Sequence, residues 1–293
     1  MTMRQTEPAA HVTAPPRHPK RVLPRDHSVP RQPTILVFDS GLGGLTVFRE
    51  IVRLRPDARY VYVADDALFP YGRIPPERLA AHLVPLMGEL IAAHAPDLVV
   101  IACHTASTLV LSVLRDAYTV PFVGTVPAIK PACAASQTRR VAVLGTEATV
   151  GREYTRALIR DYSAGCDVHL VGARHLATLA EAALRGEAVA DGDISAEIAP
   201  CFVAADGRRT DVVVLACTHY PLLADRFFAL APWPVTWIDP APAIARRVTD
   251  LVGPATATAP GPAYAVFTSG RPVPPGLRGA LARFGLAETA PAD

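Results

Sequence analysis

The sequence predicts an α/β protein made of two similar halves, each with a parallel sheet covered by helices on both faces. Most apolar runs that read as strands are followed by helical segments, and the strands are apolar along their whole length, which is typical of parallel sheets. Two pairs of matching turns indicate a duplication. Asp39 and Gly145 each follow a strand and lie 106 residues apart, and Cys103 and Cys217 lie 114 residues apart.

The first half begins with an apolar run that stops at the glycine-rich turn of residues 39–44. A loop is expected at Ala64–Ile74. The Pro75-Pro76 pair opens a helix, because proline is compatible with a first helical turn, and Pro85 is expected to bend this helix. The predicted strands are Thr34–Phe38, Arg59–Val63, Asp97–Ala102 and Val120–Gly124. The predicted helices are Leu45–Leu54, Pro76 to about Ala95, and Ser107–Tyr118.

The second half repeats this plan. The predicted strands are Arg140–Leu144, Asp167–Val171, Asp211–Ala216 and Val235–Ile238, with one more strand-like run at Ala263–Phe267. The predicted helices are Val150–Tyr162, His175–Arg185, about Ser195–Ala205, Pro221–Leu230 and Pro242–Leu251. The expected first domain is therefore 34–127 plus about 239–270, and the expected second domain is 128–238. Residues 271–293 are expected to be a C-terminal extension.

Composition and charge exclude several classes of protein. No stretch approaches the roughly 18 apolar residues that a membrane helix needs. Residues 1–33 hold seven prolines and a charge of +4, which predicts a disordered Pro/Arg-rich tail rather than a secretory signal. The remaining chain carries −2 and offers no basic surface for nucleic acid. Five cysteines, an odd number, and no export signal favour a soluble cytoplasmic protein with free thiols.

The two cysteine turns carry the chemistry. Cys103 is followed by His104 and Thr105, and Cys217 by Thr218 and His219. Ligands of α/β folds bind at the carboxyl ends of strands, so two facing halves would direct both thiols into one cleft. Inverting a carbon centre by proton transfer needs an acid on one face and a base on the other, and a thiol or thiolate can take either role. The pair therefore favours a racemase.

Other motifs support the same interpretation. The strings VFDSGLGGLTV, ADDALFPYG, IACHTAST, LGTEATV and LACTHYPLL occur in this order and together resemble glutamate racemase of the aspartate/glutamate racemase superfamily. The match covers about Thr34 to Val252. It implies two similar flavodoxin-like parallel-sheet α/β domains related by a pseudo-twofold axis, with the active site in the cleft between them. It also implies a cofactor-independent cytoplasmic enzyme that supplies D-glutamate for peptidoglycan synthesis.

The resemblance assigns roles to particular residues. Cys103 and Cys217 would deprotonate and reprotonate Cα from opposite faces, assisted by Asp39 and His219 respectively. Glu181 resembles a glutamate near the second cysteine. The positions that match substrate-binding residues are Ser40, Pro70, Tyr71, Gly72, Thr105, Thr218 and, as a departure from the family pattern, His104. The family usually has Asn at that position. His104 keeps a hydrogen-bond donor but is bulkier and can carry charge, which leaves altered substrate preference open.

The implied partners are the substrate glutamate, a second copy of the chain in a homodimer, and a UDP-linked muramoyl-alanine precursor that activates some family members. No nucleic acid or membrane partner is expected. The alternative is another racemase of the same superfamily, one that acts on a different amino acid such as aspartate or on a hydantoin.

Alternatives from other classes remain open on the residues alone. Cys103, His104, Cys217 and His219 could form a zinc site, although neighbouring residues such as Cys103 and His104 seldom bind one ion together. A one-sided thiol decarboxylase would need only one cysteine. A non-catalytic amino-acid binder would also suit two halves around a cleft. Pyridoxal phosphate would require Lys130, the only lysine outside the tail, in a segment that favours a solvated helix residue.

Overall fold

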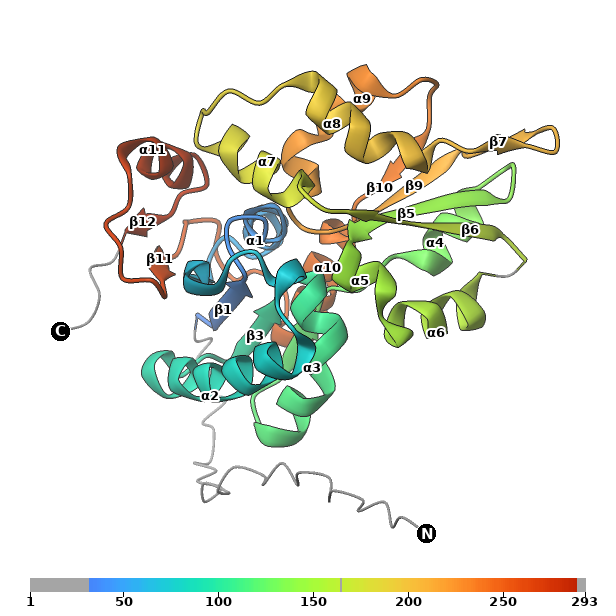
Figure 1. Cartoon of the computed structure of the whole chain (residues 1–293). Helices are drawn as coiled ribbons and strands as arrows, with labels where there is room; N and C mark the ends of the chain where they lie inside the picture. The colour runs from blue at the N-terminus through green and yellow to red at the C-terminus, as the bar shows by residue number, and fades with distance from the viewer. Residues whose placement is uncertain (1–31, 164, 289–293) are drawn as a thin grey trace, which may run out of the picture. The chain divides into compact units, whose positions relative to one another are not determined.

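The structure is a computed structural model that describes residues 32–163 and 165–288 (Figure 1). All elements described belong to the compact unit that begins at Gln32. The predicted disordered tail therefore lies, apart from Gln32 and Pro33, outside the described residues, as do residues 289–293 of the predicted C-terminal extension.

The first half is organised around a six-stranded parallel sheet with the order β12-β11-β2-β1-β3-β4. Its strands are β1 (Thr34–Asp39), β2 (Arg59–Ala64), β3 (Leu98–Ile101), β4 (Phe122–Gly124), β11 (Ala263–Phe267) and β12 (Ala287–Glu288). Both faces are buried, because Ile35 and Val37 of β1 belong to one apolar cluster and Leu36 and Phe38 to another. Continuous apolar strands are therefore required here, as the sequence predicts.

The second half contains a four-stranded parallel sheet with the order β10-β9-β5-β6. Its strands are β5 (Arg140–Thr146), β6 (Asp167–Ala173), β9 (Val212–Ala216) and β10 (Thr236–Ile238). Taken in chain order, β5, β6, β9 and β10 occupy the same relative positions as β1, β2, β3 and β4. The shared order confirms the predicted α/β fold of two similar parallel-sheet halves.

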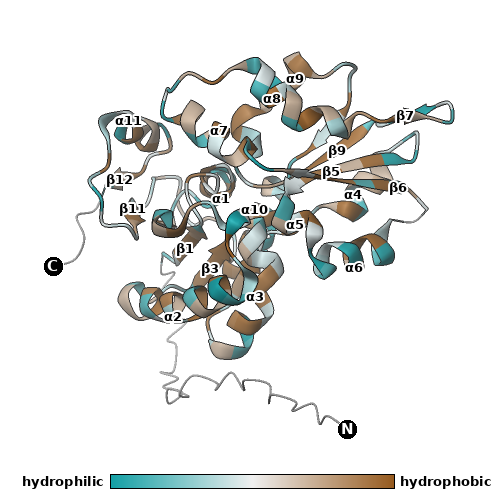
Figure 2. Cartoon of the chain, in the orientation of Figure 1, coloured by the Kyte–Doolittle hydropathy of each residue, from teal (hydrophilic) through white to brown (hydrophobic). Residues whose placement is uncertain are grey.

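Helices cover the sheets; the central strands are largely hydrophobic, and the helices carry both hydrophobic and hydrophilic residues (Figure 2). The first sheet is covered by α1 (Leu45–Leu54), α2 (Pro76–His94), α3 (His104–Ala117), α10 (Ala241–Val252) and α11 (Pro275–Arg283). The second half contains α4 (Ile129–Ala135), α5 (Glu147–Gly151), α6 (Glu153–Tyr162), α7 (Leu176–Leu184), α8 (Asp191–Ile198) and α9 (Ala224–Leu230). Short 3-10 turns occur at η1 (Asp66–Leu68), η2 (Tyr71–Arg73), η3 (Ala199–Cys201) and η4 (Tyr220–Leu223).

The end of the chain returns to the first sheet. Helix α10 packs against α1, and β11 pairs with β2. Beyond residue 270, α11 buries Leu277 and Leu281 in the same cluster as Ile35, and β12 adds a short parallel strand beside β11. Part of the predicted extension thus contributes to the core of the first half, while the domain boundaries themselves stay a prediction.

One predicted helix is wrong at both ends. The segment predicted as Ser195–Ala205 is helical from Asp191 to Ile198, and Pro200 then lies in the η3 turn. Ala204–Ala205 (β7) pairs antiparallel with Arg208–Arg209 (β8). Asp206 and Gly207 between them both have positive φ, the arrangement that an Asp-Gly hairpin turn requires.

Two other predicted helices are interrupted. The helix predicted over Val150–Tyr162 divides at Arg152 into α5 and α6, and Pro221 lies in the 3-10 turn η4 before α9 begins at Ala224. In the part of the chain that the structure describes, no helix is long and apolar enough to cross a membrane.

Candidate active site

A pocket lies at the carboxyl ends of the strands and is lined by side chains from both halves. It has about 300 Å³ of empty space, counted to its open mouth. The predicted residues that line it are Ser40, Pro70, Tyr71, Gly72, Cys103, His104, Thr105, Cys217, Thr218 and His219. Phe69, Thr146 and Ala177 line it as well. The remaining predicted residues, Asp39 and Glu181, are buried and bond to the glycine-rich turn behind it.

Cys103 caps the N-terminus of α3, directly after β3 and Ala102. This helix begins at His104 rather than at the predicted Ser107, so His104 and Thr105 belong to its first turn. The Cys103 thiol is buried and donates a hydrogen bond to Ser40 Oγ at 3.6 Å. Burial, together with the charge of Asp39, raises the pKa of Cys103 to about 12. Cys103 is therefore a protonated thiol in the free protein.

Asp39 ends β1 and is fully buried. Its Oδ2 accepts hydrogen bonds from the backbone N–H groups of Gly41 at 3.2 Å and Gly44 at 3.0 Å, and its Oδ1 accepts from Thr218 Oγ1 at 3.4 Å. Burial raises the pKa of Asp39, although the charge of His219 and these amides oppose the shift. The Asp39 carboxyl group is thus buried in the first half and bonded to the second.

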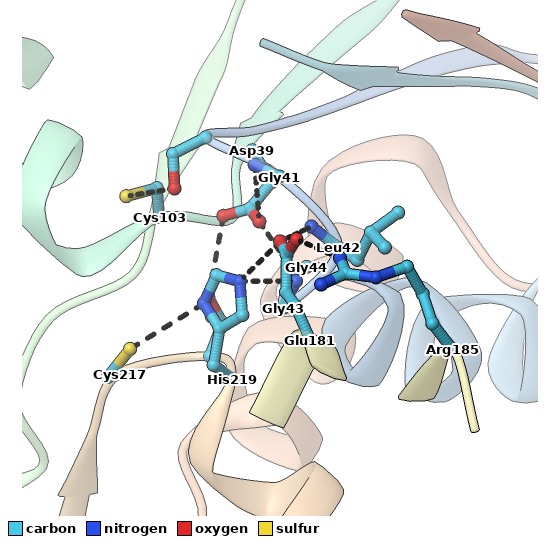
Figure 3. A network of polar contacts seen from close by, with 12 residues as sticks. Asp39, Gly41, Leu42, Gly43, Gly44, Cys103, Glu181, Arg185, Cys217 and His219 are labelled. Atoms are coloured by element: carbon cyan, nitrogen blue, oxygen red, sulfur yellow. Dashed lines mark hydrogen bonds and ion pairs between the residues drawn. The ribbon is translucent and has the colours of Figure 1, made fainter. Parts of the chain in front are cut away.

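Cys217 is flanked by a histidine and a glutamate (Figure 3). The distance from Cys217 Sγ to His219 Nδ1 is 3.7 Å, and His219 Nε2 lies 3.0 Å from Glu181 Oε1. Glu181, on α7, also accepts the Leu42 N–H at 2.8 Å and pairs with Arg185 at 3.2 Å. Sulfur, imidazole and carboxylate therefore form one chain, so an N–H at Nδ1 can stabilise negative charge on the Cys217 sulfur.

The protonation of His219 follows from these neighbours. Burial lowers its pKa, but hydrogen bonds to and charges on Cys217 and Glu181 outweigh burial and raise the pKa well above the usual value. The same contact lowers the pKa of Glu181 against its own burial. In the charged ring, Nε2–H donates to Glu181. In the neutral ring, Nε2 instead accepts the Gly43 N–H, which lies at 3.1 Å.

The glycine-rich turn is needed for this close approach. A Cβ atom at Gly41 would collide with Glu181 Oε1, and one at Gly43 would collide with the His219 ring. A Cβ at Gly44 would lie 2.7 Å from Asp39 Cβ, closer than real Cβ contacts allow. The turn therefore brings backbone N–H groups of the first half against the acid–base residues of the second.

His104 differs from every other polar group of the pocket. It is 2% exposed, and neither ring nitrogen has a hydrogen-bond partner among residues 32–163 and 165–288. Burial alone lowers its pKa to about 3, so the ring is neutral. A buried polar group without a partner costs free energy, and such groups in native proteins call for an explanation. Here the pocket itself is the adjacent space from which a partner can come.

Thr105 and Thr146 line the pocket, and their hydroxyl groups are bonded to each other. Thr105 Oγ1 lies 3.0 Å from Thr146 Oγ1 and 3.2 Å from Thr149 Oγ1. Thr146 also caps α5 by accepting the Thr149 N–H. Thr146 was not among the predicted site residues, although it ends a predicted strand run and precedes a helix. Among the described residues that line the pocket, none is Lys or Arg.

Two alternatives can be compared with this geometry. The described residues contain no group of three or more His, Cys, Asp or Glu side chains placed to hold a metal ion. Lys130 is exposed on α4, where its Nζ lies 6.0 Å from the centroid of the Tyr162 ring, and it does not line the pocket.

Comparisons with known proteins agree with the pocket and the fold. The sequence profile of the Asp/Glu/Hydantoin racemase family matches residues 35–248. A glutamate racemase from Brucella anthropi is 60% identical over 221 residues, which cover 75% of this chain and 80% of that protein. One from Brucella canis is 56% identical over 232 residues, with 77% and 84% covered.

Solved structures agree as well. The crystal structure of Escherichia coli glutamate racemase in complex with L-glutamate and the activator UDP-MurNAc-ala has a TM-score of 0.78 and 35% identity, and covers 89% of this chain and 99% of that one. Glutamate racemase isoform RacE1 from Bacillus anthracis has a TM-score of 0.72 and 26% identity, with 89% and 97% covered.

Proposed function

The chain belongs to the Asp/Glu/hydantoin racemase family and is an amino-acid racemase, and from this premise we propose that it interconverts L- and D-glutamate without a cofactor. The observation that carries the proposal is that Cys103 and Cys217, from equivalent strands of the two halves, line the same pocket. The glutamate racemases that are 56% and 60% identical support the choice of substrate.

The proposed reaction is a proton transfer at each face of Cα. One cysteine, as thiolate, takes the α-proton and becomes a thiol, while the electron pair of the C–H bond stays on the substrate as a carbanion. The other cysteine, as thiol, then donates its proton to the opposite face and becomes the thiolate. The product has inverted configuration, and the two cysteines have exchanged protonation states, so the reverse reaction uses the same groups in opposite roles.

The buried neighbours set these protonation states. The high pKa of Cys103 makes it the acid of the resting enzyme, and Asp39 in the same half assists its proton exchange. The His219–Glu181 pair faces the Cys217 sulfur and stabilises its negative charge. Preorganised donors of this kind lower the cost of charge that develops during reaction.

Neutral donors would hold the substrate. Because no described lining residue is Lys or Arg, we assign the carboxylates to the hydroxyl groups of Ser40, Thr105 and Thr218, to the His104 imidazole and to the backbone of the turn Pro70–Gly72. The substrate ammonium group would find acceptors among the same hydroxyl groups. Donors in a pocket with little water bind more strongly than the same groups would in solution.

The test is α-proton exchange and racemisation of each glutamate enantiomer in deuterated water, followed by NMR and circular dichroism. We expect Cys103→Ala and Cys217→Ala each to abolish racemisation, because inversion needs both faces. Cys166→Ala, which does not line the pocket, is the matched control and should retain the activity. Full racemisation by either site variant would overturn the two-cysteine mechanism. Racemisation of aspartate faster than that of glutamate would overturn the assignment of glutamate as the substrate.

We also propose the wider role of the family: supply of D-glutamate for peptidoglycan synthesis in the cytoplasm, by a homodimer that a UDP-linked muramoyl-alanine precursor activates. The five described cysteines are all free, which is compatible with a reducing compartment. The Escherichia coli relative was solved with an activator of this class. Adding the precursor to the racemisation assay should raise kcat, and light scattering should give the mass of a dimer. No rise and a monomer mass would contradict these two assignments.

A further inference from the structure

The turn Pro70–Gly72 contributes to the pocket, but its most polar atom points elsewhere. Tyr71 is 1% exposed and lines the pocket, while its hydroxyl group donates a hydrogen bond to Asp65 Oδ2. The hydroxyl group of Tyr71 is therefore taken up by Asp65, next to the end of β2. Its ring and backbone are the parts that a substrate in the pocket can contact.

Asp65 is the centre of this second set of contacts. It follows β2 directly, is fully buried, and its backbone N–H donates to the Asp39 carbonyl oxygen at 2.9 Å. In addition to Tyr71, its carboxylate accepts from His82 Nε2 at 2.8 Å and from Thr268 Oγ1 at 2.5 Å. A buried carboxylate is costly unless it is well bonded, so these donors restrict where the Asp65 side chain can lie.

One of these donors comes from the next helix, and the other comes from a distant part of the chain. His82 lies on α2, and Thr268 directly follows β11, more than 200 positions after Asp65 in the sequence. The next residues repeat the connection. Asp66 accepts from the Ser269 N–H at 2.9 Å and from Ser269 Oγ at 2.6 Å. The segment after β11 is thus bonded to the start of the loop that carries the turn Pro70–Gly72.

We propose that Asp65, held by Thr268 and His82, is a positioning residue that acts through the Tyr71 hydroxyl group to fix the turn Pro70–Gly72 at the substrate pocket. It touches neither cysteine, so it controls how well the pocket binds its substrate and not the proton transfer. This inference rests on the proposed function for its substrate, but the contacts themselves do not depend on it.

The central experiment compares two variants of Thr268. Thr268→Ser keeps the hydroxyl group that donates to Asp65, and Thr268→Val keeps the shape but removes the donor. We expect KM for both glutamate enantiomers to rise about 10- to 100-fold in Thr268→Val, the factor that corresponds to one hydrogen bond to a charged group, with kcat within about threefold. Thr268→Ser should behave as the wild type.

A double-mutant cycle identifies the residue through which Asp65 acts. Asp65→Asn removes an acceptor, and Tyr71→Phe removes its donor, so each should raise KM. If the two side chains act as one unit, the double variant should be no worse than the poorer single variant. Full additivity of the two effects would overturn the proposed path through Tyr71.

Hydrogen–deuterium exchange gives a readout that needs no activity. The N–H groups of Arg73 and Ile74 bond to the carbonyl oxygens of Pro70 and Tyr71, and they report directly on the turn. We expect faster exchange in the peptide 66–74 of Thr268→Val and Asp65→Asn, but not of Thr268→Ser. Unchanged exchange and unchanged KM in both would overturn the inference, as would a fall in kcat without a rise in KM. An inactive wild type would contradict only the proposed function, because the exchange result would still stand.

Discussion

The substitution His104→Leu should stabilise the free protein and weaken it as an enzyme. Leucine is close to histidine in size and has no polar atoms, while both nitrogens of the buried His104 ring lack partners. Removing an unsatisfied buried polar group gains about 1–3 kcal/mol. An imperfect fit of the new side chain takes back roughly 1 kcal/mol. The free energy of unfolding should therefore rise by about 0–2 kcal/mol.

The same change should cost substrate affinity. The neutral ring carries one N–H donor and one acceptor, and the proposed substrate brings two carboxylates. Losing a hydrogen bond to a charged group corresponds to about 1.5–3 kcal/mol, so KM should rise about 10- to 100-fold. Stability and affinity would then move in opposite directions, which a purely structural role of His104 does not predict.

Urea unfolding without substrate measures the first effect, and racemisation kinetics by circular dichroism measure the second. His104→Asn is the matched control, because its amide keeps a donor and an acceptor. It should retain KM within a few-fold while the smaller side chain lowers stability. A less stable His104→Leu protein with wild-type KM would refute the reasoning.

Three further changes test other parts of the structure. Glu181→Gln removes a charge that raises the pKa of His219, so His219 should lose its proton at lower pH. The alkaline limb of the pH–activity profile should then move to lower pH. An unmoved limb would contradict this role of Glu181. Gly43→Ala places a methyl group against the His219 ring, so the free energy of unfolding should fall by about 1–3 kcal/mol and kcat at least tenfold. Wild-type kcat would show that the backbone of the turn can shift to make room for the methyl group. Asp57→Asn breaks the buried ion pair between Arg55 and Asp57, whose Nε and Oδ1 atoms lie 2.9 Å apart. The free energy of unfolding, measured in urea titrations, should fall by about 3–5 kcal/mol. The folded enzyme should keep its kcat.

Local patterns predict the parts of the fold that burial alone determines. The runs that become β1, β3, β5 and β9 must be apolar because both faces of each sheet are covered, and the sequence reads them correctly. The predicted helix of about Ser195–Ala205 wrongly included β7, although the Asp206-Gly207 turn that follows was a usable local signal for a hairpin. Strand β12 has only two residues and exists because β11 offers an open edge, so no local pattern announces it.

The candidate site depends both on which residues follow the strands and on contacts between the two halves. The rule that ligands bind at carboxyl ends of parallel strands places Cys103 and Cys217 in one pocket, where the structure has them. The bond from Thr268 to Asp65 was not predictable, because it depends on the pairing of β11 with β2, which are distant in the sequence. The bond from Tyr71 to Asp65 spans only six residues but depends on the conformation of the loop between them. The sequence also could not predict that the His104 ring has no hydrogen-bond partner among the described residues, because this depends on which side chains pack around the ring.

The groups that the proposed reaction assigns to each cysteine are bonded to the opposite half. Asp39 accepts from Thr218 of the second half, and Glu181 accepts from Leu42 of the first. Separating the halves would break both contacts together. In the proposed reaction, a substrate that enters by opening of the halves would therefore meet the complete set of acid–base groups only after the halves close.

This coupling predicts the effect of a contact outside the pocket. Thr46 Oγ1, on α1, lies 3.0 Å from the carbonyl oxygens of both Gly43 and Thr218, and it shares its one donor hydrogen between them. Its contact with Thr218 joins the halves without lining the pocket. Thr46→Val removes about 1 kcal/mol of closure energy, so kcat/KM should fall about fivefold for both enantiomers alike. Thr46→Ser keeps the donor and should not differ from the wild type. Wild-type kcat/KM in Thr46→Val would contradict this role of Thr46. The two enantiomers must change together in any variant, because their equilibrium constant is one and fixes equal kcat/KM values in both directions.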